Sequence, residues 1–136
     1  MDKGIKENLF NSNGRLGKKK FLKRILLIEI LLFSLTELIY RCFLLNNFIM
    51  FIIQLPFIYS RYTLMCRRLH DSDRSNSQAK ALTILCLISL FLNTNASIMI
   101  NFIIIGGEIY ILLRDGTVGL NAYGNDPLKL TDKSYL

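Results

Sequence analysis

The hydrophobic positions of this chain gather into four long blocks that polar segments separate. An apolar helix needs roughly 20 residues to cross a bilayer. The first two blocks meet this length and predict membrane-spanning helices. The last two are nearer to about 15 residues, a length that suits a re-entrant hairpin as well as two short spans. We expect two short spans, because polar flanking residues can extend each helix by a turn. The blocks cover residues 21–45, 48–66, 79–92 and 98–113.

This pattern predicts an all-α polytopic membrane protein, a four-helix transmembrane bundle with two short C-terminal spans. Residues 1–136 would form a single membrane domain, with a basic leader over residues 1–20 and a glycine-rich tail over residues 114–136. Hydrophobic residues make up 51% of the chain, which alone does not separate soluble from membrane proteins. Their clustering does, because few charged residues lie in the interior of the blocks: Glu29, Glu37, Arg41, Arg61 and Glu108.

The charge distribution adds an orientation to this fold. The chain has 17 Lys and Arg against 10 Asp and Glu, a net charge of +7. Residues 1–24 carry 8 of the 17 cations, residues 67–80 carry 4, and the tail carries 3. Cytoplasmic loops are enriched in Lys and Arg, and an even number of spans places these three segments on one side. We therefore expect both termini in the cytoplasm.

Polar residues lie at matching depths in the second and fourth predicted spans. Arg61 and Glu108 each precede by six residues an arginine that ends the block. Gln54 and Asn101 each lie seven residues earlier, which returns to nearly the same helix face. Because these two spans would run parallel, we predict a buried ion pair between Arg61 and Glu108 and an amide pair between Gln54 and Asn101. Glu29, at a comparable depth in the first span, could compete for Arg61 or remain protonated.

Two interpretations of these intramembrane residues stay open. A lone charge at the bilayer centre costs at least about 2.5–3.5 kcal/mol, so the residues could simply pair to hold short helices together. Ionisable residues inside a membrane also mark proton and ion pathways. A relay through Arg61, Glu108 and Glu29 is the second interpretation.

Three motifs flank the predicted spans and carry a family resemblance. They are Gly14-Arg15 before the first block, Arg67-Arg68-Leu69-His70-Asp71 after the second, and a closing segment over residues 116–127 that contains Asn121, Tyr123, Gly124, Asp126 and Pro127. In this order and position they resemble domain of unknown function 805, a family of small bacterial inner-membrane proteins. The resemblance covers nearly the whole chain. It implies a bacterial inner-membrane location and a fold, but no activity, since the family's biochemical role is unassigned.

The residues of the second motif also suggest contacts of their own. We expect Arg67 and Arg68 to meet phosphate headgroups, while the His-Asp pair that follows caps and orients the loop. The histidine could instead act as a pH-responsive latch against the tail. The glycines of the tail predict consecutive tight turns. We expect these turns to fold back onto the loop, with Asp126 or Asp115 contacting one of the two arginines.

Metal, cofactor and catalytic sites are not expected. The chain has one His, and its three cysteines, Cys42, Cys66 and Cys86, are too widely spaced for a common zinc site. The tail has neither a phosphate-binding loop nor a calcium-binding loop pattern. The basic leader adjoins a span and has no nucleic-acid recognition motif, so nucleic acid is not an expected partner. We therefore expect a protein that is not an enzyme.

The function that fits these features best is a non-enzymatic membrane module. It would bind anionic lipid headgroups or a partner membrane protein through its basic cytosolic face, and it could form a homo-oligomer. The alternative is a small transporter or a proton- or ion-conducting subunit that uses Arg61, Glu108 and Glu29.

Overall fold

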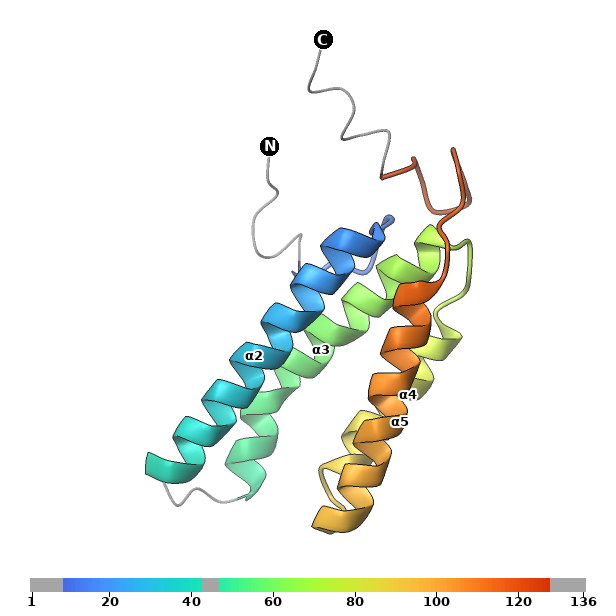
Figure 1. Ribbon diagram of the computed structural model, residues 1–136. Helices are drawn as coiled ribbons and strands as arrows, with labels where there is room; N and C mark the ends of the chain where they lie inside the picture. Colours follow the sequence, from blue (N-terminus) through green and yellow to red (C-terminus); the bar gives the residue numbers. More distant parts are fainter. Residues whose placement is uncertain (1–8, 43–46, 128–136) are drawn as a thin grey trace.

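A computed structural model describes residues 9–42 and 47–127, and this part of the chain is all-α, as the sequence predicts. Helices α2 and α3 form one antiparallel hairpin, and α4 and α5 form a second (Figure 1). Within the described residues the helices are α2 (Lys18–Cys42), α3 (Asn47–Asp71), α4 (Ser77–Ser89) and α5 (Thr94–Leu113).

Helices α3 and α5 meet at one end of the molecule and diverge at the other, where Phe51 of α3 contacts Phe91, just after α4, with ring centroids 5.5 Å apart. Figure 1 shows α2 beginning, and α3 and α5 ending, at the upper end of the view, whereas α3 and α5 separate toward the lower end. We call the upper end the motif end. Two hydrophobic clusters hold the described helices together. The larger one, near the motif end, contains Leu16, Phe21, Ile25, Ile28, Leu64, Met65, Cys66, Leu69, Ala79 and Ile111. The smaller one contains Ile58, Cys86 and Ile104.

Helix α2 carries apolar side chains on both its buried and its exposed face. Phe21, Ile25 and Ile28 recur at helical spacing and lie in the core. Leu26 and Ile30, which lie between and beyond them, are exposed on the outside of the molecule. Apolar side chains on the outer face are typical of a helix that faces lipid.

Helix α3 is longer than its apolar block. The block was expected to stop at residue 66, but the helix continues to Asp71, so the second motif forms its last turn rather than a loop. The helix ends there because Asp73 adopts a left-handed conformation with φ of 52°. The amide of Arg74 then donates to Leu69 O (3.0 Å) and that of Asp73 to His70 O (3.1 Å), which is the Schellman pattern of helix termination.

The turn between α4 and α5 is also shorter than expected. Residues 93–97 were predicted to be the connection, but α5 already begins at Thr94. Asn93 is its N-cap, and the Asn93 side chain accepts a hydrogen bond from the Ala96 amide at 3.0 Å. The added turn brings α5 to 20 residues.

Two of the four helices are long and apolar enough to cross a membrane, over Ile49–Asp71 and Thr94–Leu113. Helix α2 has the length, but it carries Glu29, Glu37 and Arg41 within its apolar stretch. Helix α4 has 13 residues, which at 1.5 Å per residue gives about 20 Å. This is less than the roughly 30 Å of a bilayer core.

Candidate functional site

All three sequence motifs meet at the motif end. Leu16, which follows the first motif, donates its amide to Arg67 O at 3.0 Å. Thr117, in the closing segment, donates its amide to Asp71 O at 2.8 Å. The closing segment thus folds back over the end of α3, as the glycine pattern predicts.

Arg15 is the residue that connects the three motifs. Its Nε donates to Asp71 Oδ1 (3.0 Å), and Nη1 donates to Gly119 O (2.6 Å) and Gly124 O (3.4 Å). Nη2 donates to Asp71 O (3.4 Å) and to Thr117 O. A guanidinium has five N–H donors, so every donor of Arg15 has an acceptor. The Arg15 side chain is 1% exposed and its Asp71 partner 6%.

Arg68 holds the end of α5 to the end of α3. Its Nη1 pairs with Asp71 Oδ2, and its Nη2 donates to the carbonyl oxygens of Leu112 (3.5 Å) and Arg114. Leu112 lies in the last turn of α5 and Arg114 is its C-cap, so these carbonyls have no partner within the helix. The Arg68 side chain is fully buried. The expectation that Arg68 meets lipid phosphates is therefore wrong, because its charge is used inside the protein.

The prediction that Asp115 or Asp126 contacts Arg67 or Arg68 agrees with an electrostatic interaction between Asp115 and Arg68. The carboxylate that pairs directly with Arg68 is Asp71, since the continued helix places the two residues one turn apart. Asp115 Oδ1 lies 2.6 Å from Lys18 Nζ, and Asp126 Oδ2 accepts from the Gly119 amide at 3.2 Å. The Lys18 ammonium beside it lowers the pKa of the exposed Asp115 carboxyl.

His70 and Asn121 fasten the rest of the closing segment. The His70 ring stacks on Tyr123 with centroids 3.8 Å apart and an angle of 5° between the rings. His70 Nδ1 lies 3.3 Å from Gly14 O, a carbonyl that can only accept. Asn121 Nδ2 donates to His70 O at 2.9 Å. The side chain of His70 therefore contacts the first and the third motif, rather than a loop of its own.

One glycine of the closing segment is required by close packing. A Cβ atom on Gly116 would lie 2.4 Å from Asp71 Oδ2. That carboxylate cannot move aside, because Arg15 and Arg68 hold it from two directions. Gly119 is required for another reason, since its φ of +85° lies in the left-handed region that favours glycine.

A groove of about 560 Å³ opens beside this junction. Its lining comes from the residues at the start of α2, from the end of α3 and from the closing segment. Its charged residues are Arg15, Lys18, Lys19, Lys20, Asp71, Asp115 and Asp126. The first turn of α2 carries no acidic residue, and its preceding residue, Gly17, has no side chain to cap the helix. The positive end of the helix and its lysines therefore border the same groove. We call this feature the lysine groove.

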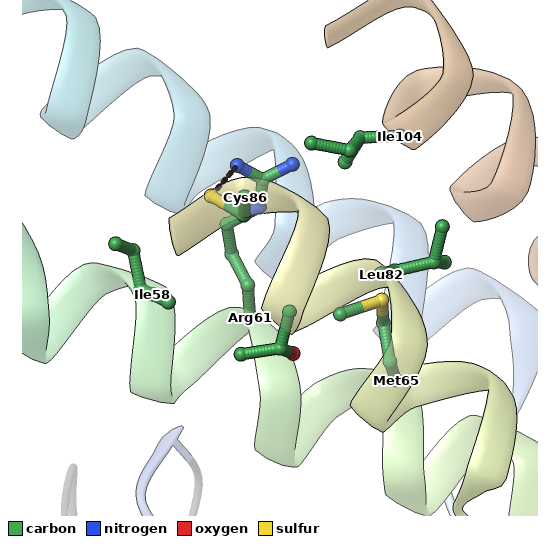
Figure 2. A pocket seen from close by; sticks show the side chains of 7 residues that line it. Ile58, Arg61, Met65, Leu82, Cys86 and Ile104 are labelled. Atoms are coloured by element: carbon green, nitrogen blue, oxygen red, sulfur yellow. Dashed lines mark hydrogen bonds between the residues drawn. The ribbon is translucent and has the colours of Figure 1, made fainter. Parts of the chain in front are cut away.

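A second charged cluster lies in the middle of the bundle. The predicted ion pair is present, with Arg61 Nη2 2.8 Å and Nε 3.1 Å from Glu108 Oε1. Glu29 also approaches, its Oε1 being 2.8 Å from Arg61 Nε. Arg61 Nη1 lies 3.9 Å from Cys86 Sγ, as Figure 2 shows. Arg61 of α3 thus contacts one residue on each of the other three helices.

The space beside Arg61 is small. Figure 2 shows it between α3, α4 and α5, lined by apolar side chains such as Ile58, Met65 and Ile104. Its volume is about 10 Å³. This is close to the minimum that holds one water molecule.

The predicted amide pair does not form. Among the described residues, no hydrogen bond joins Gln54 to Asn101; Asn101 is exposed, and its Nδ2 lies 3.5 Å from Ser97 Oγ on its own helix. The reason is the divergence of α3 and α5 toward their N-terminal ends (Figure 1), where both amides lie. The side chain of Arg41, with which Glu37 could form a pair four residues apart, lies outside the described residues.

Cysteines and metal-ligand groups offer no further site in the described part of the chain. Cys66 and Cys86 are free and buried, and the Cys42 side chain is not described. No group of three His, Cys, Asp or Glu residues that could hold a metal ion occurs among the described residues.

Some residues of these sites carry little signal in the sequence. Arg15 and Asp71 are 56 residues apart, and Thr117 contributes through its backbone, so neither contact follows from a local pattern. The Arg68–Asp71 pair had a detectable signal, an i, i+3 spacing that becomes an ion pair once the helix is continued. Cys86 had none, because a cysteine in an apolar helix is ordinarily a packing residue.

The comparisons with known proteins agree with the motifs. Residues 9–125 match the family described as "Protein of unknown function (DUF805)", a stretch that holds nearly all of the three motifs. No curated protein and no solved structure matches the chain. The chain therefore belongs to the DUF805 family of proteins of unknown function.

Proposed function

We propose that this protein is a four-span protein of the bacterial inner membrane that binds anionic phospholipid headgroups in the lysine groove, on the cytoplasmic side. The lysine groove is the observation that carries the proposal. Lipid binding of this kind needs no catalytic residue, and the protein would act as a membrane module rather than as an enzyme.

The outer surface of the helices supports the membrane placement. Only Ile104 and Ile111 of α5 are buried, although nearly all of this helix is apolar. Its exposed side chains include Phe102 and Ile103. A helix that is apolar on all sides and largely unburied is typical of a membrane span. The hydrocarbon of a bilayer would cover this surface without cost.

Packing also supports a membrane location for α2 and α4, the two helices that are not long or apolar enough to be identified as spans by themselves. Helix α2 packs along α3, and α4 packs between α3 and α5. If α3 and α5 cross the bilayer, then α2 and α4 lie in the same layer. Glu29 in the middle of α2 is then acceptable because its carboxyl group lies 2.8 Å from Arg61 Nε.

The lysine groove lies at the depth where headgroups are expected. Lys18, Lys19 and Lys20 open α2, and the long apolar part of this helix begins after Arg24. Lysines at such a boundary attract anionic lipids with about 1 kcal/mol per residue near the surface. The backbone N–H groups of the first helical turn add donors suited to a phosphate group. Fifteen of the 17 Lys and Arg residues would share this side of the membrane, in agreement with the positive-inside rule.

Native mass spectrometry of the detergent-purified protein tests the proposal, with phosphatidylglycerol and phosphatidylcholine as probes. We expect the protein to bind phosphatidylglycerol more tightly than phosphatidylcholine. The double variant K19Q/K20Q removes two groove charges and should weaken phosphatidylglycerol binding about thirtyfold, from about 2 kcal/mol. The matched control is R74Q/K80Q, which removes two exposed cations near the start of α4, outside the groove.

Two results would overturn the proposal. One is equal binding of the two lipids by the unchanged protein. The other is an equal loss in K19Q/K20Q and R74Q/K80Q, since general charge rather than the lysine groove would then attract the lipid.

A further inference from the structure

We propose that Glu29 is a lipid-facing proton-binding site: it holds a proton because Arg61, which lies between the two glutamates, neutralises Glu108 instead. The inference rests on the proposed placement of α2 in the membrane and goes beyond headgroup binding, since the ligand is a proton at the middle of the bundle.

The charges of the central cluster do not balance when both glutamates are ionised. Glu29 Oε1 and Glu108 Oε1 lie 2.8 Å and 3.1 Å from the same nitrogen, Arg61 Nε. Two carboxylates and one guanidinium carry a net charge of −1 in a region of low dielectric constant. Two carboxylates that share a site do not both ionise easily, and a net charge inside a bilayer is costly. One bound proton makes the cluster neutral.

The hydrogen bonds show which carboxyl group holds that proton. Both hydrogen bonds that Arg61 donates to a carboxylate go to Glu108 Oε1. Glu29 Oε1 is buried and accepts no hydrogen bond, although Arg61 Nε is near. Hydrogen bonds donated to a carboxylate favour its charged form. Glu108 is therefore the ionised partner of Arg61, and Glu29 is the protonated one.

The surroundings of Glu29 make it accessible from the lipid. Its side chain is 39% exposed, whereas that of Glu108 is 11% exposed. Leu26, Ile30 and Phe33 surround it on the outer face of α2 and are themselves exposed. On the inner side the groups that face it are Arg61 of α3 and Glu108 of α5, with the Cys86 thiol of α4 beside Arg61.

Proton release would act on the packing of the whole bundle. Arg61 contacts all three other helices, so an ionised Glu29 competes with Glu108 for the residue at which these helices meet. The site therefore couples a protonation event to the arrangement of α2 against α3 and α5.

Carbodiimide labelling in vesicles tests this assignment. Dicyclohexylcarbodiimide partitions into lipid and reacts with protonated carboxyl groups: the carboxyl oxygen bonds to the carbodiimide carbon and the proton moves to nitrogen. The adduct rearranges to a stable N-acylurea without a leaving group, and mass spectrometry locates it. We expect labelling of Glu29, no labelling of Glu108, and a rate that falls as the pH rises.

The variant E108Q gives the sharper result. It leaves Glu29 as the only counter-ion of Arg61, so Glu29 should ionise and its labelling should fall by about tenfold or more. The matched control is E37Q, which changes another glutamate of α2 and should leave the labelling of Glu29 unchanged. Because the pH profile of the unchanged protein needs no variant, the test survives misfolding of E108Q.

Three results would overturn the proposal, and they separate its two parts. Absence of labelling at Glu29, or unchanged labelling of Glu29 in folded E108Q, would show that Arg61 does not determine which glutamate holds the proton. Equal labelling of Glu29 by a water-soluble carbodiimide would show instead that α2 faces water, and the membrane placement itself would fail.

Discussion

Single residues at the motif end connect segments that are far apart in the sequence. Arg15 uses all five of its donors, on Asp71 and on three backbone carbonyls of the closing segment. A flat guanidinium can satisfy acceptors arranged in this way, whereas a lysine ammonium has three donors and a single nitrogen. The identity of this side chain, and not only its charge, should therefore determine whether the closing segment stays in place.

The substitution R15K tests this expectation. It keeps the charge, but a single nitrogen cannot reproduce the five hydrogen bonds that Arg15 donates from three nitrogens, so we expect a loss of about 2–4 kcal/mol in the free energy of unfolding. Thermal unfolding in detergent measures the loss. The control R74K makes the same change at an exposed arginine and should be neutral. Equal stability of the two variants would contradict the role given to Arg15.

The polar residues of α3 and α5 show which contacts can be predicted from the sequence. Arg61 and Glu108 could be paired from their matching depths, because a charge inside a membrane needs a partner. The same reasoning failed for Gln54 and Asn101, since amides can remain exposed or bond locally, as Asn101 does with Ser97. Equal depth therefore predicts a contact for buried charges better than for neutral amides.

Helices α4 and α5 approach each other closely at Gly107. A Cβ atom on Gly107 would lie 2.7 Å from Leu82 Cδ2, while one on the neighbouring Gly106 would meet no atom within 4 Å. Small residues allow membrane helices to approach closely. Gly107 therefore contributes to the contact, and Gly106 faces away from it.

The pair G107A and G106A tests this contact with matched changes. Because alanine has a higher helix propensity than glycine, both substitutions should stabilise α5 by the same amount, up to about 1 kcal/mol. Only G107A must displace Leu82, so it should be less stable than G106A by about 1–3 kcal/mol in the same unfolding assay. If the two variants are equally stable, α4 and α5 do not approach at Gly107.

The ends of the elements were the least predictable part of the fold. The four helices could be located from the apolar blocks, but α3 runs to Asp71 and α5 starts at Thr94. In both places polar side chains and backbone geometry decide the end, through the left-handed Asp73 and the Asn93 cap. The polar residues that suggested loops in the sequence are the same residues that terminate or cap helices.

For the whole molecule, two charged centres divide the structural tasks. The junction of Arg15, Arg68 and Asp71 closes the motif end, and Arg61 joins all four helices nearer the middle. Toward the other end α3 and α5 diverge (Figure 1). The buried polar contacts thus lie where the helices converge, and apolar side chains cover the outside.

The central claim is a four-span arrangement with the motif end in the cytoplasm, and site-directed cysteine labelling tests it most directly. The test uses a chain with its three native cysteines replaced by alanine. V118C then places a thiol at an exposed position of the closing segment, at the motif end, and N95C places one at an exposed position in the first turn of α5, at the opposite end of the helix. With a membrane-impermeant maleimide, N95C should react in intact cells and V118C only after the membrane is opened. Reaction of both thiols from the same side would contradict the account.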